Sequence, residues 1–159
     1  MVNTQSPYDD ILVHAKTQKE ADLLLSEIDE LLSSLYVIKK NALQTVLEKS
    51  VRVDVARGIE SLLPRSKKPE DIKTVLHSLR NDVQKIPTLK VTLAFEPSEK
   101  MIETLYDWAK ETLGEIVLLD ITYDPLIVGG VVMSWKGAYI DASLKTKLDN
   151  NLQHLASSS

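Results

Sequence analysis

The hydrophobic period of this chain changes at Pro87, and no other feature constrains its fold as strongly. Before Pro87, apolar residues recur at the spacing of one helix face. After it, apolar and polar residues alternate from Leu89 to Phe95, as in a strand with one buried face. We therefore expect an α+β fold with a helical domain or small bundle over 1–86. A small α/β domain with a mixed sheet and two helices is expected over 87–159.

Three helical segments are predicted before Pro87. The first spans 18–35, the second spans 38–63, and the third begins at Pro69, a residue suited to the first helical turn. The acidic residues of the first segment, Glu27 among them, are expected to face mostly away from its apolar stripe. Residues 1–16 are left open, because their short apolar run fits either a helix or a strand.

The second half is predicted to alternate strands, helices and turns. Ser98 and Gly114 have the residue types that begin and end a helix. The expected order is a strand at 89–95, a helix from Ser98 to Gly114, a strand at 116–122, a turn at Asp124-Pro125, a strand at 127–134 containing Gly129-Gly130, a hairpin turn at Lys136-Gly137, a strand at 138–140 and a helix capped by Ser143.

Composition excludes several classes of function. The chain of 159 residues has no cysteine, so a disulfide framework, a thiolate nucleophile and a sulfur-ligated zinc site are excluded. Its formal net charge of −4 argues against a nucleic-acid partner. The first ten residues lack the pattern of a signal or transit peptide, and no apolar run approaches the ~20 residues that a membrane helix needs. Any membrane role is expected to be peripheral.

No set of residues predicts catalysis, a cofactor or a metal. Gly129-Gly130 is followed by Val131 and not by the Lys-Ser/Thr pair of a phosphate loop, so the glycines are interpreted as a bulge or a close backbone approach within a strand. Asp124 precedes a proline, and Asp141 precedes Ser143. Both are common positions for a short side chain that accepts a hydrogen bond in a turn or cap.

The last predicted helix carries a leucine stripe that has two interpretations. Such a stripe packs on the domain's own sheet, or it presents a groove to a partner helix. Both interpretations stay open, and the two roles can be shared. The stripe consists of Leu144, Leu148, Leu152 and Leu155.

Three pieces of the second half, in order, resemble one family. The run Asp124-Pro125-Leu126-Ile127-Val128-Gly129-Gly130 is followed by Tyr139-Ile140-Asp141-Ala142-Ser143, and both follow Val91-Thr92-Leu93-Ala94-Phe95-Glu96-Pro97-Ser98. Together they resemble the C-terminal domain of F-type ATP synthase delta subunits, whose mitochondrial relative is the oligomycin-sensitivity-conferral protein. The resemblance covers 88–152. It makes Asp124, Pro125, Gly129, Gly130, Asp141 and Ser143 the family motif.

This resemblance implies a stator subunit that catalyses nothing. In the family, the N-terminal domain binds the alpha subunit of the catalytic head and the C-terminal domain binds the b-type peripheral-stalk subunit. The implied location is peripheral, at the cytoplasmic face of a membrane in a bacterial-type complex. The three predicted helices before Pro87 are fewer than the family's N-terminal bundle has, so contact with the b subunit is the better supported of the two contacts.

Two alternatives remain at this point. An E-type stator subunit of V-type or A-type ATPases also places long helices before a small α/β domain with paired glycines, although Asp124-Pro125 and Asp141-x-Ser143 favour the delta subunit. A small phosphate- or nucleotide-binding α/β enzyme is less well supported, because the lysine that follows the glycines of such loops is missing.

Overall fold

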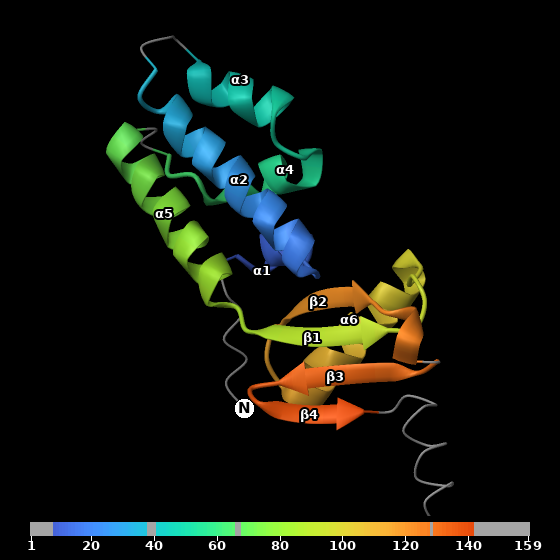
Figure 1. Cartoon of the computed structure of the whole chain (residues 1–159). Helices are drawn as coiled ribbons and strands as arrows, with labels where there is room; N and C mark the ends of the chain where they lie inside the picture. The colour runs from blue at the N-terminus through green and yellow to red at the C-terminus, as the bar shows by residue number, and fades with distance from the viewer. Residues whose placement is uncertain (1–7, 38–40, 66–67, 128, 142–159) are drawn as a thin grey trace, which may run out of the picture. The chain divides into compact units, whose positions relative to one another are not determined.

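The chain divides into two compact units, Met1–Ile86 and Pro87–Ser159. The computed structural model describes residues 8–37, 41–65, 68–127 and 129–141 (Figure 1). The unit Met1–Ile86 is called the helical unit below, and its described part consists of helices and their connections. The second, called the sheet unit, holds a four-stranded mixed sheet and a helix. The predicted α+β class is confirmed.

The helical unit has more helices than the sequence pattern predicts. Its five described helices are α1 (Asp9–Leu12), α2 (Gln18–Ser34), α3 (Ala42–Lys49), α4 (Val53–Leu62) and α5 (Pro69–Lys85). The helices predicted over 18–35 and from Pro69 are confirmed. The single helical region predicted over 38–63 is wrong, because the chain breaks into α3 and α4. Within residues 1–16, for which the sequence fits either a helix or a strand, Asp9–Leu12 form the short helix α1.

The break between α3 and α4 has a specific cause at Arg52. This residue has φ −57° and ψ 137°, and its backbone N–H donates to the Glu27 carboxylate over 2.9 Å. An N–H that is bonded to another helix cannot also donate to the carbonyl four residues earlier, which continuation of α3 requires. Helix α3 already ends at Lys49, and the bond from Glu27, 25 positions away, holds Arg52 as the N-cap of α4, so the two helices do not run on as one.

Local capping fixes where α2 begins. The Thr17 hydroxyl accepts from the Glu20 backbone N–H at 3.2 Å, and Glu20 Oε2 accepts from the Thr17 backbone N–H at 2.9 Å. This reciprocal pair is a capping box, and its Thr-x-x-Glu pattern is visible in the sequence. At the start of α5, Pro69 occupies the first turn as expected.

The core of the helical unit lies between α2, α3, α4 and α5. Helix α2 packs against both α3 and α5, and α4 packs against α1 and α3 (Figure 1). The apolar stripes of α2 and α5 are the buried faces of these helices, as their spacing predicts. The fully buried side chains of these two helices include Leu24, Ile28, Leu31, Leu76, Leu79 and Val83.

The sheet unit follows the predicted order with different strand limits. Its elements are β1 (Thr88–Leu93), α6 (Glu99–Leu113), β2 (Leu118–Tyr123), the 3-10 turn η1 (Pro125–Ile127), β3 (Val131–Trp135) and β4 (Ala138–Asp141). The strands lie in the order β2-β1-β3-β4, and β1 is parallel to β2 and antiparallel to β3. The Ser98 cap and the left-handed Gly114 cap of α6 are confirmed. Ser143 and the helix predicted after it lie outside the described residues.

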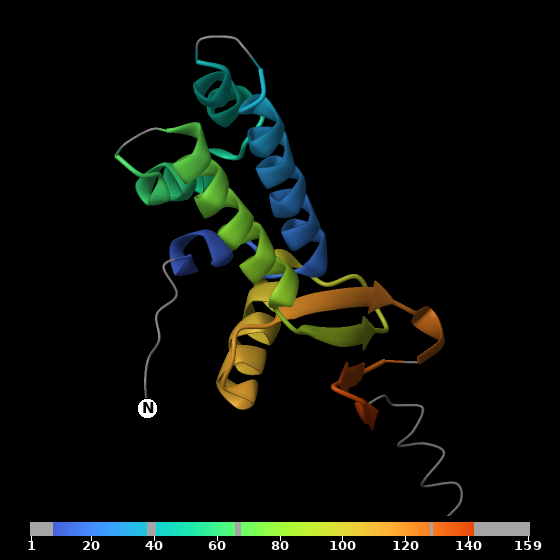
Figure 2. The ribbon, with the colours of Figure 1, turned by 90° about the vertical axis from the view of Figure 1, so that its left-hand side faces the viewer.

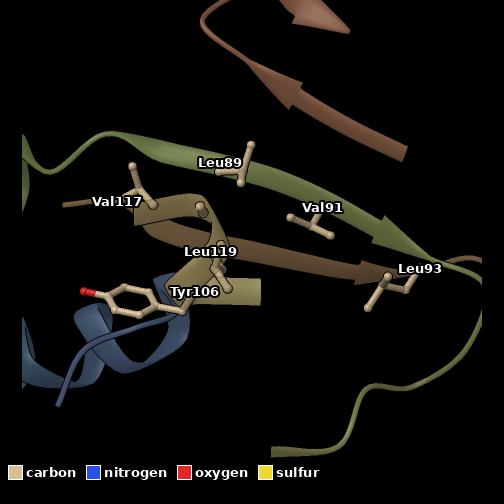
Figure 3. Close-up of a cluster of buried hydrophobic side chains, with 7 residues drawn as sticks. Leu89, Val91, Leu93, Tyr106, Val117 and Leu119 are labelled. Atoms are coloured by element: carbon tan, nitrogen blue, oxygen red, sulfur yellow. The ribbon is translucent and has the colours of Figure 1, made fainter. Parts of the chain in front are cut away.

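One face of the sheet packs against α6 and forms the core of this unit. Figure 2 shows α6 lying on one side of the strands. Leu89, Val91 and Leu93 of β1 meet Tyr106 of α6 and Leu119 of β2 in a buried cluster (Figure 3). The inward alternation of β1 is therefore confirmed from Leu89 to Leu93.

The strand does not extend to Phe95. The chain bends after Leu93, and Phe95 is 49% exposed, so the prediction that it continues the buried face is wrong. Tyr106 is 5% exposed and belongs to the core, although the pattern of α6 did not single it out. It lies four positions after Ile102 and three before Ala109, on the same apolar face of α6 that packs into this core.

Candidate partner-binding surface

Asp124 organises the turn that follows β2. Its backbone N–H donates to the Leu93 carbonyl over 2.9 Å, which joins the ends of β2 and β1. Its side-chain Oδ1 accepts from the Leu126 backbone N–H at 2.9 Å, the geometry of a turn closed by a short acidic side chain. Asp124 thus has the acceptor position that the sequence suggested. Pro125 begins the 3-10 turn that comes next.

Gly129 and Gly130 lie before a strand and not inside one. Their φ angles are 82° and 88°, in the region that glycine enters without a side-chain clash. The strand predicted over 127–134 is therefore wrong in its first part: η1 ends at Ile127, and β3 begins at Val131. The two glycines turn the chain from the end of η1 into β3, so they do not form a bulge within the sheet.

The acidic residues of this unit do not gather into a site. Asp120 lies on β2 and Asp141 on β4, which are the two outer strands of the described sheet. Three strand spacings separate them, about 14 Å at ~4.8 Å per spacing. In the part of the chain that the structure describes, no group of three or more His, Asp and Glu side chains could hold a metal ion.

Exposed apolar side chains gather at the carboxyl ends of β1 and β2. These parallel strands point to the same edge of the sheet, with Leu93 beside Tyr123 (Figure 1). At or just beyond that edge, Phe95 is 49%, Tyr123 59% and Leu126 77% exposed. We call these three residues the carboxyl-end patch. Exposed large apolar groups that share one edge are typical of protein-binding surfaces.

On the side of the sheet that faces α6, side chains become more exposed from β1 to β4. The register places Val91, Met133 and Ile140 in one row across β1, β3 and β4. Val91 is 1% exposed, Met133 is half-buried, and Ile140 is 56% exposed. Among the described residues, helix α6 therefore covers the β1 end of this row far better than the β4 end. We call Val131, Met133, Trp135 and Ile140 the half-covered face.

A hairpin fixes the outer edge of the half-covered face. Trp135 pairs with Ala138 across the turn Lys136-Gly137, whose φ angles are 45° and 86°. This confirms the predicted hairpin. The Lys136 ammonium lies 4.8 Å from the centre of the Trp135 ring and 2.6 Å from Glu115 Oε1. These contacts hold Trp135 at the rim of the face.

The helical unit contributes a separate cleft with polar and apolar side chains in its wall. A cavity of about 600 Å³ opens between the ends of α2, α3, α4 and α5. Leucine and isoleucine side chains from all of these helices or their ends contribute to its wall. They are Leu35, Leu43, Leu47, Leu63 and Ile72. The residue pattern gave no signal for this cleft, because its wall comes from four segments that meet only in the folded unit.

The described helices differ from membrane-spanning helices in length and composition. None of them combines the length and the apolar character that crossing a membrane requires.

Several known proteins that are similar to this chain share one name. A family model described as "ATP synthase delta (OSCP) subunit" matches residues 26–155. "ATP synthase subunit delta" of Rhodopseudomonas palustris (strain TIE-1) is 31% identical over 120 residues, which are 74% of this chain and 64% of that protein. The protein of that name from Bradyrhizobium sp. (strain BTAi1 / ATCC BAA-1182) gives the same identity and coverage. The chain thus spans a little under two thirds of the length of these relatives.

Proposed function

Because the chain belongs to the ATP synthase delta (OSCP) subunit family, we propose that it is a non-catalytic peripheral-stalk subunit of a proton-translocating F-type ATP synthase. In this role it links the catalytic head to the b-type stalk subunit and catalyses no reaction itself. The observation that carries the proposal is the family match over 26–155, which includes most of the helical unit and most of the sheet unit. The same match favours the delta-type stator over the E-type stator.

The sheet unit is proposed to bind the b-type stalk subunit. A stator link resists torque, and a tight link requires apolar contact area with few unsatisfied polar groups. The carboxyl-end patch and the half-covered face supply such area, because their side chains are exposed or half-buried. The family motif supports this surface: Asp124 and Pro125 shape the turn that presents Leu126, and Gly129 and Gly130 lead into β3.

The leucine stripe after β4 is proposed to complete the same surface. Leu144, Leu148, Leu152 and Leu155 lie outside the described residues and follow directly on Asp141, the last residue of β4. Helical spacing would let these leucines cover the half-covered face, contact the b-type subunit, or share both contacts. Asp141 and Ser143 belong to the motif that leads into this stripe.

The helical unit is proposed to contact the alpha subunit of the catalytic head. Its cleft between the ends of α2, α3, α4 and α5 is concave and of a size that accepts several side chains of a partner helix. In the assembled enzyme, the chain would be held at the cytoplasmic face of the membrane through its partners.

Calorimetry with a stalk peptide tests the proposal. The full chain would be titrated with a synthetic peptide of the C-terminal helix of a b-type subunit, taken from the ATP synthase of the same organism. We expect saturable binding with Kd of about 10 μM or tighter, as for a small apolar interface. A scrambled peptide of equal composition is the control. Absence of heat from the native peptide at several times this concentration would contradict the b-binding role.

A thermal-shift measurement separates this role from the phosphate-binding enzyme. A ligand that binds only the folded state raises Tm by mass action. We expect ATP with Mg²⁺, at millimolar concentration, to leave Tm unchanged, because Val131 follows the paired glycines where a phosphate loop would need lysine. A reproducible rise in Tm with nucleotide would favour the enzyme.

A further inference from the structure

The segment from Tyr8 to Ala15 packs deeply although it precedes the residues that match the family. The family match begins at residue 26. Nevertheless Ile11 and Ala15 are each 1% exposed and Leu12 is 5% exposed. The only helix in this segment, α1, has four residues. One turn of helix does not persist in water by itself, because nucleation costs more than one hydrogen bond returns. The segment is therefore held by what it packs against.

Its partner is α4, and the contact depends on Gly58. A Cβ atom added at Gly58 would lie 2.6 Å from Ile11 Cγ1, closer than real atoms approach. Val55 and Ile59, which flank Gly58 along α4, are each 1% exposed. Glycine in a helix interior costs stability relative to alanine unless close approach requires it. Here the missing side chain makes the space that Ile11 occupies.

Polar contacts mark the end of this segment. Arg52 Nη1 donates to the His14 carbonyl over 3.3 Å. After Ala15, the backbone N–H groups of Lys16 and Thr17 both donate to Glu20 Oε2 at the start of α2. The chain is thus fixed from Lys16 onward by α2 itself, whether or not the preceding segment is docked.

From these contacts we propose that residues 8–15 form a strap, a segment that fills an apolar groove over Gly58 of α4 and opens locally while α2 to α5 stay folded. The occupant of this groove is a segment of the same chain. Opening requires the loss of the Ile11, Leu12 and Ala15 contacts and of the His14 hydrogen bond. It leaves the buried stripes of α2 and α5 in place. Opening of the strap would expose the Gly58 side of α4, and this inference does not depend on the proposed stalk function.

Hydrogen exchange of the full chain tests the strap. If it opens locally, backbone amides of residues 11–15 exchange about 100-fold faster than the protected amides of α2 and α5, as sub-global openings do. Low concentrations of urea leave the exchange of the strap unchanged and accelerate that of α2 and α5. Equal exchange rates and equal urea dependence in the strap and in α5 would overturn the proposal.

A pair of variants makes the test specific. Gly58→Ala is expected to accelerate exchange in the strap about 10-fold or more while α5 changes little, because the new methyl group displaces Ile11. When Ile11 is first replaced by alanine, adding Gly58→Ala should accelerate strap exchange much less, because the side chain that the new methyl group would meet is gone. Arg57→Ala, at the exposed neighbouring position, is the control and should leave the strap unchanged. Acceleration of α2 and α5 as large as that of the strap would contradict local opening.

Discussion

The two units of this chain differ in the side chains that they bury. In the helical unit, even a carboxylate is buried: Glu27 is 4% exposed and pairs with Arg52 across 25 positions of sequence. In the sheet unit, large apolar side chains such as Leu126 and Ile140 are exposed, and the α6-facing side is incompletely covered by the described residues. Among the described residues, only the helical unit buries a charged side chain, whereas one face of the sheet in the sheet unit is only partly covered.

The positions of the tryptophans allow the two units to be followed separately. Both tryptophans of the chain, Trp108 and Trp135, lie in the sheet unit. Most of the described helical residues lie in α1 to α5. Tryptophan fluorescence therefore reports unfolding of the sheet unit, and circular dichroism at the helical band reports mainly the helical unit.

Removal of the Glu27 carboxylate should have the largest effect on stability. Glu27→Ala leaves the Arg52 backbone N–H and guanidinium without their acceptor at the α3–α4 break. Breaking a buried ion pair costs about 3–5 kcal/mol, and the one-third exposure of the Arg52 side chain lowers our expectation to about 2–3 kcal/mol. The urea transition seen by circular dichroism should move accordingly.

The control for this prediction is Glu30→Ala, at an exposed position of the same helix. It should change stability by less than about 0.5 kcal/mol. If Glu27→Ala moved the tryptophan transition as far as the dichroism transition, the two units would be energetically coupled. That result would contradict the prediction that Glu27 stabilises the helical unit alone.

Gly130→Val is the corresponding change in the sheet unit. A β-branched residue at φ 88° is strained, and we expect a loss of about 2 kcal/mol in the tryptophan-detected transition. Gly130→Asn should lose less, because asparagine enters the left-handed region more readily. Equal stability of the valine variant and the wild type would show that the backbone at this turn adapts without cost.

A substitution in the carboxyl-end patch should affect binding and leave stability nearly unchanged. Leu126 is 77% exposed, so Leu126→Asp should shift both unfolding transitions by less than about 0.5 kcal/mol. Binding of the stalk peptide should weaken about 10-fold, equivalent to ~1.4 kcal/mol. Thr112→Asp, on the exposed side of α6, is the control with the same charge change. Equal affinity of the two variants would remove the patch from the proposed interface.

The smallest effect is expected at the surface of the helical unit. Arg80 Nε lies 2.8 Å from Asp29 Oδ1 and joins α5 to α2, with both side chains one-third to one-half exposed. Arg80→Ala should cost about 0.5 kcal/mol, and the loss should shrink at high salt because exposed pairs are screened. A loss comparable to that of Glu27→Ala would mean that burial does not distinguish the two ion pairs.

Features of the fold that depend on local sequence could be predicted. Pro69 begins α5, Ser98 and Gly114 cap α6, and Lys136-Gly137 forms the hairpin. Each of these residues acts on its own backbone or on residues within one turn of it. The period change at Pro87 likewise reflects the side chains of each element itself, which is why the α+β class was correctly predicted.

Features that depend on distant residues could not be predicted. Glu27 is expected to face mostly away from the apolar stripe, but it is buried because Arg52, the N-cap of α4, supplies its donors. No local pattern connects these two residues. The roles of Gly129 and Gly130 were also misassigned, since a pair of glycines fits a bulge and a turn equally well until φ is known. For the candidate surface, the motif located the Asp124 turn but gave no indication that Phe95 and Tyr123 are exposed beside it.

Hydrogen exchange of the full chain with and without the b-type stalk peptide most directly tests the division of roles between the units. The account predicts that the peptide slows exchange in the sheet unit, around 93–95, 121–127 and 131–141, and leaves α2 to α5 unchanged. Protection confined to the helical unit, with the sheet unit unaffected by bound peptide, would contradict it.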